Sequence, residues 1–373
     1  MKSRYAFLAS LLIAAAAQAH KPSDSYLALS VDGAALRGQW DIALRDLEFA
    51  IGLDADANGE ITWGELRAKH ADIAAYALAR LAVRADGRDC GLTPTGHLAD
   101  EHSDGGYAVL RFEAACGPAA PASVEVTYSL FFDLDPTHRG LLRFEWGGAA
   151  QTGVLSPERP TLAFRAGEAA PLAQFLDYLR EGVWHISIGI DHVLFVLSLL
   201  LPSVFVLRNK EWKAAERFRD TFWDVFKVVT SFTVAHSITL SLAALAVISL
   251  PSRLVESTIA LSVVLAALNN LKPVVAERRW AVAFAFGLIH GFGFASVLAD
   301  LGLRQGTLLL ALVGFNLGVE VGQLAIVGTF LPLAYALRDG WFYRRVVFGG
   351  GSAAIVLIAA IWLVERAFDL KLL

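Results

Sequence analysis

The second half of the chain is dominated by apolar segments that are long enough to cross a lipid bilayer. A membrane-spanning helix needs about 20 mainly apolar residues. The composition agrees, because 55% of the 373 residues are hydrophobic and only 18% are charged, which indicates an integral membrane protein. Six segments have the required length, at residues 184–207, 223–249, 252–271, 280–300, 306–336 and 345–365. Membrane lipid is therefore an expected partner. Nucleic acid is not an expected partner, because the net charge is only −4.

The first 19 residues have the pattern of a secretory signal peptide. Two basic residues precede an apolar run at 7–17, and the small-residue pattern Ala17-Gln18-Ala19 follows it. The alternative is an uncleaved anchor helix, for which the apolar run is short. Cleavage after Ala19 would make His20 the new N-terminus. Its free amine and imidazole would then offer a chelating site for a divalent metal, or the terminus would be loose, as termini commonly are.

Residues 20–165 are more polar and rich in turns, and they alternate as strands do. We expect a hairpin from 26–31 and 36–44, with further strands at 81–84, 107–112, 123–132 and 140–146, and a helix at 66–81. This pattern predicts an exported, mainly-β domain folded as a small antiparallel sandwich. The two cysteines, Cys90 and Cys116, both lie in this region, and an oxidising compartment would allow them to pair.

The loop at residues 54–65 matches the calcium-binding pattern of the EF-hand. The expected oxygen donors are the side chains of Asp54, Asp56 and Asn58, the backbone carbonyl of Glu60, Thr62 directly or through water, and a bidentate Glu65. The alternative is an acidic turn that caps the following helix. A single loop outside the cell predicts Ca²⁺ in a structural role more than a cytosolic type of sensor.

A linker at residues 166–182 is expected to join this domain to a six-span membrane domain at 183–373. Lysines and arginines concentrate in the loops at 208–219, 272–279 and 338–345. Because such residues favour the cytoplasmic side, we expect a bacterial inner-membrane protein with its N-terminal domain and its C-terminus on the periplasmic side.

Ionisable residues occur where the first apolar segment begins, at His185, Asp191 and His192. Charged and polar side chains in a membrane are costly, so they commonly mark a site or a pathway. In a regular helix the two histidines share a face but lie about 10 Å apart along the axis, and Asp191 points about 120° away from His185. We therefore expect either a helix that starts irregularly at Gly189 or two histidines that bind the metal at successive positions along a path. Asp191 would orient a histidine of another span.

The later segments carry few polar groups. His236 lies in the second, and His290 lies near the middle of the fourth. On the fifth, a rotation of about 100° per residue places Asn316, Glu320 and Gln323 on one arc. Glycines line the other side of that segment and flank His290, and they are expected to let helices pack closely.

Imidazole and carboxylate ligands suit nickel, cobalt or zinc, and the lack of cysteine in the membrane part argues against Cu(I). The membrane part, roughly residues 175–370, resembles the HupE/UreJ family of hydrogenase and urease accessory membrane proteins. The resemblance rests on His185 followed after five residues by Asp191-His192, and on His290-Gly291. In the second motif Ile289 replaces a Phe and Ser296 or Val297 stands where a Glu is expected, which makes Glu320 the substitute carboxylate.

The resemblance implies a nickel or cobalt permease in the larger branch of that family, with an exported domain. We expect Ni²⁺ or Co²⁺ as the transported ion, passing His185, Asp191 and His192 and then His236, His290 and Glu320. One alternative is an intramembrane hydrolase that holds Zn²⁺ and activates water with Glu320 or Asp191. Another is a metal-sensing accessory protein whose exported domain docks a periplasmic or metalloenzyme-maturation partner.

Overall fold

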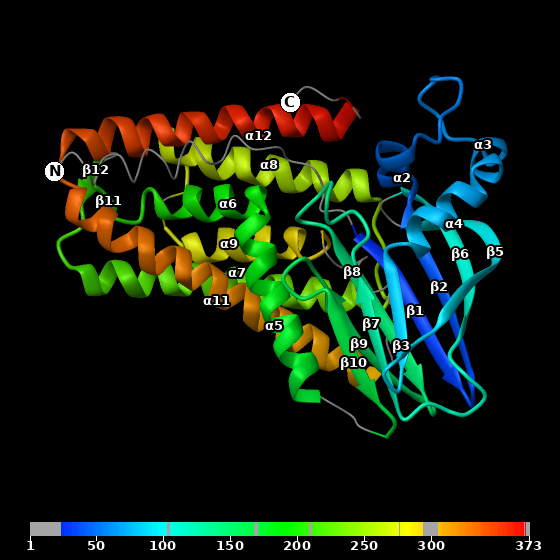
Figure 1. Ribbon diagram of the computed structural model, residues 1–373. Helices are drawn as coiled ribbons and strands as arrows, with labels where there is room; N and C mark the ends of the chain where they lie inside the picture. The colour runs from blue at the N-terminus through cyan, green and yellow to red at the C-terminus, as the bar shows by residue number, and fades with distance from the viewer. Residues whose placement is uncertain are drawn as a thin grey trace. The chain divides into compact units, whose positions relative to one another are not determined.

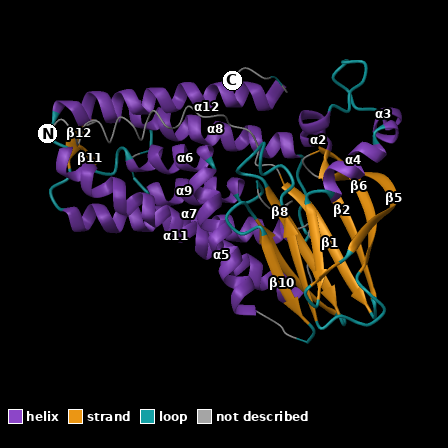
Figure 2. Ribbon diagram, in the orientation of Figure 1, coloured by secondary structure: helices purple, strands orange, loops and turns teal. Residues whose placement is uncertain are grey.

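The computed structural model describes residues 24–102, 105–167, 171–208, 211–275, 277–293, 305–368 and 370. The expected signal peptide and His20 lie outside these residues. The chain divides into two compact units, one built on residues 21–177 together with the start of α11 (Gln305–Leu337) up to Leu310, and the other on residues 178–296 and 311–373. The first unit is mainly β and the second is mainly helical (Figure 1, Figure 2).

The first unit contains two sheets. Their strands are β1 Asp24–Asp32, β2 Ala35–Ala43, β3 Leu81–Ala85, β4 Arg88–Asp89, β5 Gly91–His102, β6 Gly105–Ala115, β7 Ser123–Tyr128, β8 Arg139–Trp146, β9 Ala149–Leu155 and β10 Thr161–Arg165. The larger sheet has six strands in the order β5-β6-β2-β1-β8-β9, and the smaller has four in the order β10-β7-β3-β4. β1 and β8 run parallel, so the larger sheet is mixed and not antiparallel as expected.

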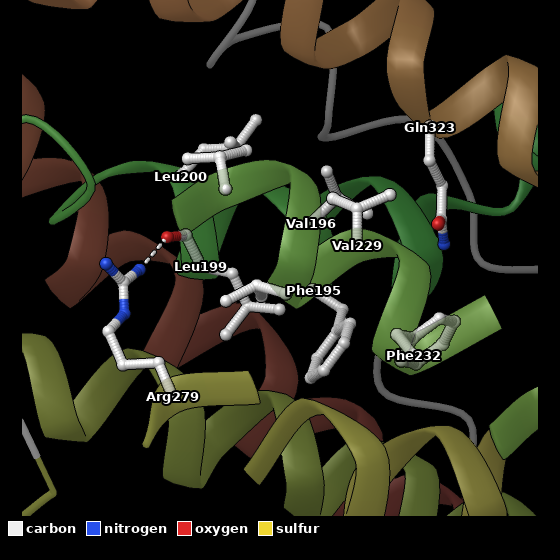
Figure 3. Close-up of a pocket in the computed structure, with 10 residues that line it drawn as sticks. Phe195, Val196, Leu199, Leu200, Val229, Phe232, Arg279 and Gln323 are labelled. Carbon is white, nitrogen blue, oxygen red and sulfur yellow. Dashed lines mark hydrogen bonds between the residues drawn. The ribbon is translucent and has the colours of Figure 1, made fainter. Parts of the chain in front are cut away.

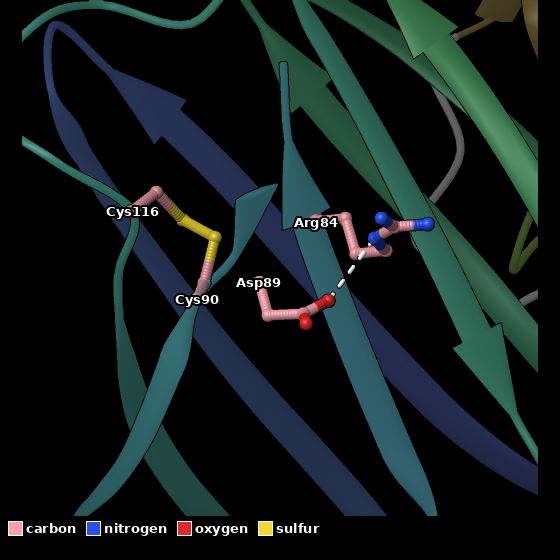
Figure 4. The surroundings of a disulfide bond; sticks show 4 residues. All are labelled: Arg84, Asp89, Cys90 and Cys116. Carbon is pink, nitrogen blue, oxygen red and sulfur yellow. Dashed lines mark ion pairs between the residues drawn. A yellow bond between two sulfur atoms is a disulfide. The ribbon is translucent and has the colours of Figure 1, made fainter. Parts of the chain in front are cut away.

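The two sheets share one apolar core, which makes the unit a sandwich. Strand residues alternate between the core and the opposite face, and alternation of this kind is what buries one face of a sheet. Trp40 and Phe112 of the larger sheet are buried in the same cluster as Val83 and Val126 of the smaller. Cys90 and Cys116 flank the paired ends of β5 and β6, where Gly91 is opposite Ala115, and they form a disulfide (Figure 4).

Short helices connect the first hairpin to β3. They are α2 Leu44–Ile51, α3 Trp63–Ala68 and α4 His70–Leu78, so the helix expected at 66–81 begins earlier and is interrupted at Lys69. Thr62 forms a capping box with Glu65, and this device fixes the start of α3. The acidic loop therefore lies between two helices, α2 and α3.

The second unit consists of α5 Pro171–Ile188, which begins in the first unit, α6 Ile190–Leu200, α7 Phe218–Ala244, α8 Ser252–Leu271, α9 Arg279–His290, α11 Gln305–Leu337, the π-helical η2 Phe342–Gly350 and α12 Gly351–Phe368. A hairpin, β11 Phe205–Arg208 and β12 Glu211–Ala214, follows α6. Residues 171–182, expected as a linker, belong to α5.

Four helical stretches of this unit are long and apolar enough to cross a membrane: 218–244, 252–271, 307–337 and 342–368. The bent pair formed by α5 and α6 raises the number to five, and α9 is a shorter apolar helix. The expected six spans are thus not all present as spanning helices in the described part of the chain. The expected fourth span continues into residues 294–300, which lie outside it.

Glycines set how closely these helices approach. A Cβ added to Gly318 of α11 would lie 2.0 Å from the Leu179 carbonyl oxygen of α5, and one added to Gly287 of α9 would lie 2.5 Å from the Phe232 carbonyl oxygen of α7. Neither position tolerates a side chain without movement of backbone. The expectation that the glycine-lined faces pack is therefore confirmed.

Candidate metal centre

Gly189 interrupts the first apolar segment and separates α5 from α6, whose axes differ by 72°. A Cβ added to Gly189 would lie 2.7 Å from the His185 carbonyl oxygen and 2.9 Å from His192 Nδ1, so the bend leaves room only for glycine. The break brings the rings of His185 and His192 to a centroid distance of 4.7 Å. Of the two expected alternatives, the irregular start at Gly189 is the one that the structure has, and the separation of about 10 Å along a regular helix does not apply.

Histidines from four helices meet at this bend. The His192 ring on α6 lies 5.3 Å from the His290 ring on α9 and 6.5 Å from the His236 ring on α7, measured between centroids. His185 on α5 is the fourth member. Exposure is 6% for His192 and 1% each for His236 and His290, so the cluster is enclosed by protein.

His192 is oriented by the residue beside it. Asp191 Oδ1 accepts hydrogen bonds from the backbone N–H of His192 at 2.9 Å and from its Nδ1 at 3.0 Å. A carboxylate only accepts, so the proton of the neutral ring is on Nδ1 and Nε2 carries the lone pair. Asp191 thus orients a histidine of its own helix, where one on another span was expected.

His236 is oriented by Asn316 of α11. The Asn316 amide nitrogen donates to the Leu312 carbonyl oxygen at 2.8 Å, which turns Oδ1 toward His236 Nδ1 at 3.3 Å. The amide oxygen can only accept, so Nδ1 of His236 donates and Nε2 keeps its lone pair.

His290 is oriented by Ser262 of α8. The Ser262 hydroxyl donates its proton to the Ile259 carbonyl oxygen at 2.6 Å, and its oxygen lies 2.8 Å from His290 Nε2. Because the single hydroxyl proton is already used, His290 Nε2–H donates and Nδ1 carries the lone pair.

All three of these lone-pair nitrogens are buried and have no hydrogen-bond partner: Nε2 of His192, Nε2 of His236 and Nδ1 of His290. Buried polar atoms are almost always satisfied, so three such atoms in one cluster require an explanation. Neutral imidazole with its second nitrogen held by a carboxylate, an amide or a hydroxyl is the usual form of a metal-ligating histidine. The arrangement can therefore bind a divalent cation.

The cluster is wider than a closed metal site. Two groups of described His, Cys, Asp and Glu residues have ligand atoms that all lie within 4.8 Å of one another, and both are in the β-rich unit: Asp41, Asp100 and His102, and Asp54, Asp56 and Glu65. The membrane histidines do not reach this spacing. An ion would contact fewer than three of these rings at once unless side chains rotate, which suits a pathway better than a permanent structural site.

A second polar layer lies along α7 and α11 beside the cluster. Thr230 Oγ1 donates to Glu320 Oε1 at 2.7 Å, while Glu320 Oε2 is buried without a partner. Thr233 Oγ1 donates to Gln323 Oε1 at 3.1 Å. Together with the bond between Asn316 and His236, these contacts turn the expected polar arc of α11 toward α7.

A small cavity of about 10 Å³ adjoins this layer and has room for about one water molecule. Figure 3 shows it between Phe195, Phe232 and Gln323 on one side and Arg279 on the other, with the Arg279 guanidinium donating to the Leu199 carbonyl oxygen. The rings of Phe195 and Phe232 also contact His290, at 4.8 and 5.3 Å between centroids.

The structure brings together most of the residues that the sequence singled out in the membrane part. His185, Asp191, His192, His236, His290 and Asn316 form one cluster, and Glu320 and Gln323 lie in the adjoining layer. Sequence reasoning noted Thr233 as a polar neighbour of His236 but missed Ser262 and Thr230. A hydroxyl residue in an apolar helix commonly bonds its own backbone, so the sequence carries no signal that these two contact the site.

The carboxylates of the acidic loop in the β-rich unit converge and accept backbone hydrogen bonds, while Glu65 also forms the capping box at the start of α3. Asp54 Oδ2 accepts from the Gly59 backbone N–H at 2.8 Å, and Glu65 accepts from the backbone N–H groups of Ala55 and Thr62 at 2.8 and 2.9 Å. These backbone hydrogen bonds lower the pKa of both carboxyl groups. Carboxylate oxygens of Asp54, Asp56 and Glu65 lie within 4.8 Å of one another. Asn58 Oδ1 instead accepts from the Glu60 backbone N–H.

Long apolar helices around a buried, hydrogen-bonded histidine cluster define a polytopic membrane protein with a candidate metal site. A family model described as HupE / UreJ protein matches residues 163–366, more than half of the chain, and the chain belongs to that family. No curated protein matches the chain.

Proposed function

We propose that the chain is a permease for a divalent transition metal, Ni²⁺ or Co²⁺. One observation carries the proposal. Three histidines on α6, α7 and α9 each have one ring nitrogen held by a protein partner, and the other is buried with no hydrogen-bond partner. Membership of the HupE/UreJ family is consistent with handling of these metals.

The donor set supports nickel or cobalt as cargo. Imidazole nitrogen and carboxylate oxygen suit these borderline ions, whereas Cu(I) prefers thiolate and thioether ligands. Both cysteines are in the β-rich unit, and the single methionine is residue 1. No sulfur ligand is therefore present in the membrane part.

The path that we propose runs from His185 and His192 past His236 and His290 to Glu320. Glu320 Oε2 is buried and unpartnered, which suits a second station for a cation. The basic loops favour the cytoplasmic side, so entry would be from the periplasmic side of a bacterial inner membrane, after signal-peptide cleavage near residue 19. The exported β-rich unit would then lie outside the cell together with the C-terminus.

Metal uptake into proteoliposomes tests the permease. We expect Ni²⁺ or Co²⁺ flux with the unaltered chain and a strong loss with His192→Ala and His236→Ala. Ser241→Ala is the matched control, because this residue lies on α7 and its hydroxyl bonds only the Ser237 carbonyl oxygen among the described residues. Absence of flux, or equal flux in all variants, would refute transport.

A zinc hydrolase is less well supported by the geometry. Catalysis would need an open ligand position and space for a substrate, whereas the cavity beside the cluster holds about one water molecule. One Zn²⁺ per chain that resists exchange during purification would favour the enzyme over the permease.

We also propose that the loop at residues 54–65 binds Ca²⁺ and stiffens the exported unit. The convergence of Asp54, Asp56 and Glu65 between two helices fits an ion that prefers oxygen ligands. Asn58, Glu60 and Thr62 complete the expected set.

A further inference from the structure

The outer face of the larger sheet carries a second group of metal-ligating side chains, in the β-rich unit. Asp41 lies on β2, and Asp100 and His102 lie on β5. One ligand atom from each residue lies within 4.8 Å of the others. Trp40 and Ile42, the neighbours of Asp41 in sequence, are in the sandwich core. Strand alternation therefore places Asp41 on the opposite face.

Aromatic rings and one amide hold the donors in place. The Tyr26 ring stacks on His102 at a centroid distance of 4.7 Å, and the Tyr107 ring lies 4.2 Å from it. Gln39 Nε2 donates to Asp41 Oδ1 at 3.1 Å, and Asp41 Oδ2 lies 3.2 Å from His102 Nε2. Groups of this kind around a metal ligand fix its orientation and raise its affinity for the ion.

The group carries negative charge that the surrounding protein leaves largely uncompensated. The side chains of Asp41 and His102 are only 10% and 9% exposed. Within the described residues, neither Asp41 nor Asp100 forms an ion pair with a lysine or arginine, and the titratable side chain that contacts Asp41 is His102. Two nearby carboxylates repel each other, and a buried one needs a cation. A bound divalent ion would supply two positive charges to this group.

We propose that Asp41, Asp100 and His102 bind a divalent transition-metal ion on the exported unit. Two carboxylate oxygens and one imidazole nitrogen form a donor set that suits Ni²⁺, Co²⁺ or Zn²⁺ and differs from the all-oxygen set of the loop at 54–65. This site is separate from the histidines of the membrane helices, and the proposal stands whether or not those helices transport metal.

Metal binding to the full-length protein in detergent tests this site. Equilibrium dialysis against Ni²⁺, with excess Ca²⁺ to occupy the oxygen-only loop, gives the number of ions bound per chain. We expect His102→Gln and Asp100→Asn each to weaken one class of bound Ni²⁺ by about tenfold or more. Asp100 is exposed, so Asp100→Asn removes a ligand without opening the core.

His97→Gln is the matched control. His97 lies on the same strand but stacks on His70 at 4.4 Å, away from the group. We expect it to bind Ni²⁺ as the unaltered chain does. Unchanged Ni²⁺ stoichiometry and affinity in both His102→Gln and Asp100→Asn would overturn the proposal. A loss in His97→Gln equal to that in His102→Gln would overturn it as well, because the effect would then belong to the strand and not to the ligands.

Discussion

Ser262 accepts a hydrogen bond from His290 across the contact between α8 and α9, at 2.8 Å. The serine proton is used on the Ile259 carbonyl oxygen, so this bond decides which nitrogen of His290 carries the lone pair. Ser262, which does not contact the ion, would thus determine which nitrogen of His290 can bind it. We expect Ser262 to act as a positioning residue of the candidate metal centre.

Ser262→Ala is expected to lower Ni²⁺ affinity of the membrane site by about 10- to 100-fold, the usual cost of losing the outer partner of a metal-ligating histidine. Ser262→Thr keeps the hydroxyl and should restore affinity. Thr258→Ala, which removes an exposed hydroxyl of α8 bonded to the Leu254 carbonyl oxygen, is the control. The measurement is Ni²⁺ binding to purified protein. A loss in Ser262→Thr equal to that in Ser262→Ala would contradict the positioning role.

Gly189→Ala is expected to disturb the bend between α5 and α6. The new methyl group would lie 2.7 Å from the His185 carbonyl oxygen and 2.9 Å from His192 Nδ1, so one of these must move. Overpacking of this kind costs about 1–3 kcal/mol, and Ni²⁺ binding should weaken because His192 is displaced. Gly328→Ala on α11 is the control, since a Cβ there meets nothing within 4 Å. Thermal unfolding and Ni²⁺ binding in detergent measure the two effects. Equal unfolding temperatures and equal Ni²⁺ affinities for Gly189→Ala and Gly328→Ala would contradict the requirement for glycine at the bend.

Part of this architecture is readable from the sequence, because it follows from local patterns. Apolar length predicted α8 at its observed bounds, 252–271, and alternation predicted β1, β2, β3, β6 and β8 close to theirs. The parallel pairing of β1 with β8 was not predicted, since it joins residues 115 positions apart, such as Asp24 and Arg139, and no local pattern encodes it. β5, β9 and β10 were missed, and β5 contains an interruption at Pro94 that weakens the strand signal.

The candidate site was predicted as a set of residues but not as a geometry. Either an irregular helix start at Gly189 or two separated histidines was expected, and only the structure shows that the bend at Gly189 brings His185 and His192 together. Helical periodicity places Asn316 and Glu320 on one face, but it does not say which helix they meet. Asp41 and His102 come together only through the pairing of β2, β6 and β5, so no local sequence pattern predicts their contact.

Glu320→Gln separates binding from transport. The amide keeps the shape of the side chain and can still accept from Thr230 Oγ1, but it has no charge. We expect Ni²⁺ binding at the histidines to stay within about twofold and uptake into proteoliposomes to fall by about tenfold or more, equivalent to about 1.4 kcal/mol. Thr329→Ala, an exposed position on the same helix, should transport normally. Full uptake by Glu320→Gln would remove Glu320 from the path.

Ca²⁺ is expected to stabilise the β-rich unit through the loop at 54–65. A ligand that binds only the folded state contributes about 2.7 kcal/mol at a concentration of 100 times its dissociation constant. Glu65→Gln should abolish the Ca²⁺-dependent rise in unfolding temperature, since Glu65 is the expected bidentate ligand. Glu60→Gln should retain it, because Glu60 contributes only its backbone carbonyl. Thermal unfolding of the full chain with Ca²⁺ and with a chelator measures the difference, and a rise that persists in Glu65→Gln would refute the site.

His138 is expected to make the β-rich unit less stable in acid. Its ring is fully buried and contacts the hydroxyl of Tyr128, and burial lowers its pKa from 6.5 to about 3. Between these two values the unfolded chain binds a proton that the folded chain does not, so acidification favours unfolding. The full stability is present above pH 6.5 and is lost progressively as the pH falls toward 3, by about 1.4 kcal/mol for each unit.

The comparison that isolates this effect is between the unaltered chain and His138→Gln. Glutamine does not titrate, so the variant should start less stable at pH 7.5 but should lose less stability between pH 6.5 and pH 4.5. Urea unfolding of the full-length protein in detergent, detected by protease cleavage within residues 24–167, gives the free energy of unfolding at each pH. Parallel pH profiles for the two proteins would show that His138 is not the group that titrates, because removal of a buried neutral imidazole must flatten the profile through linkage.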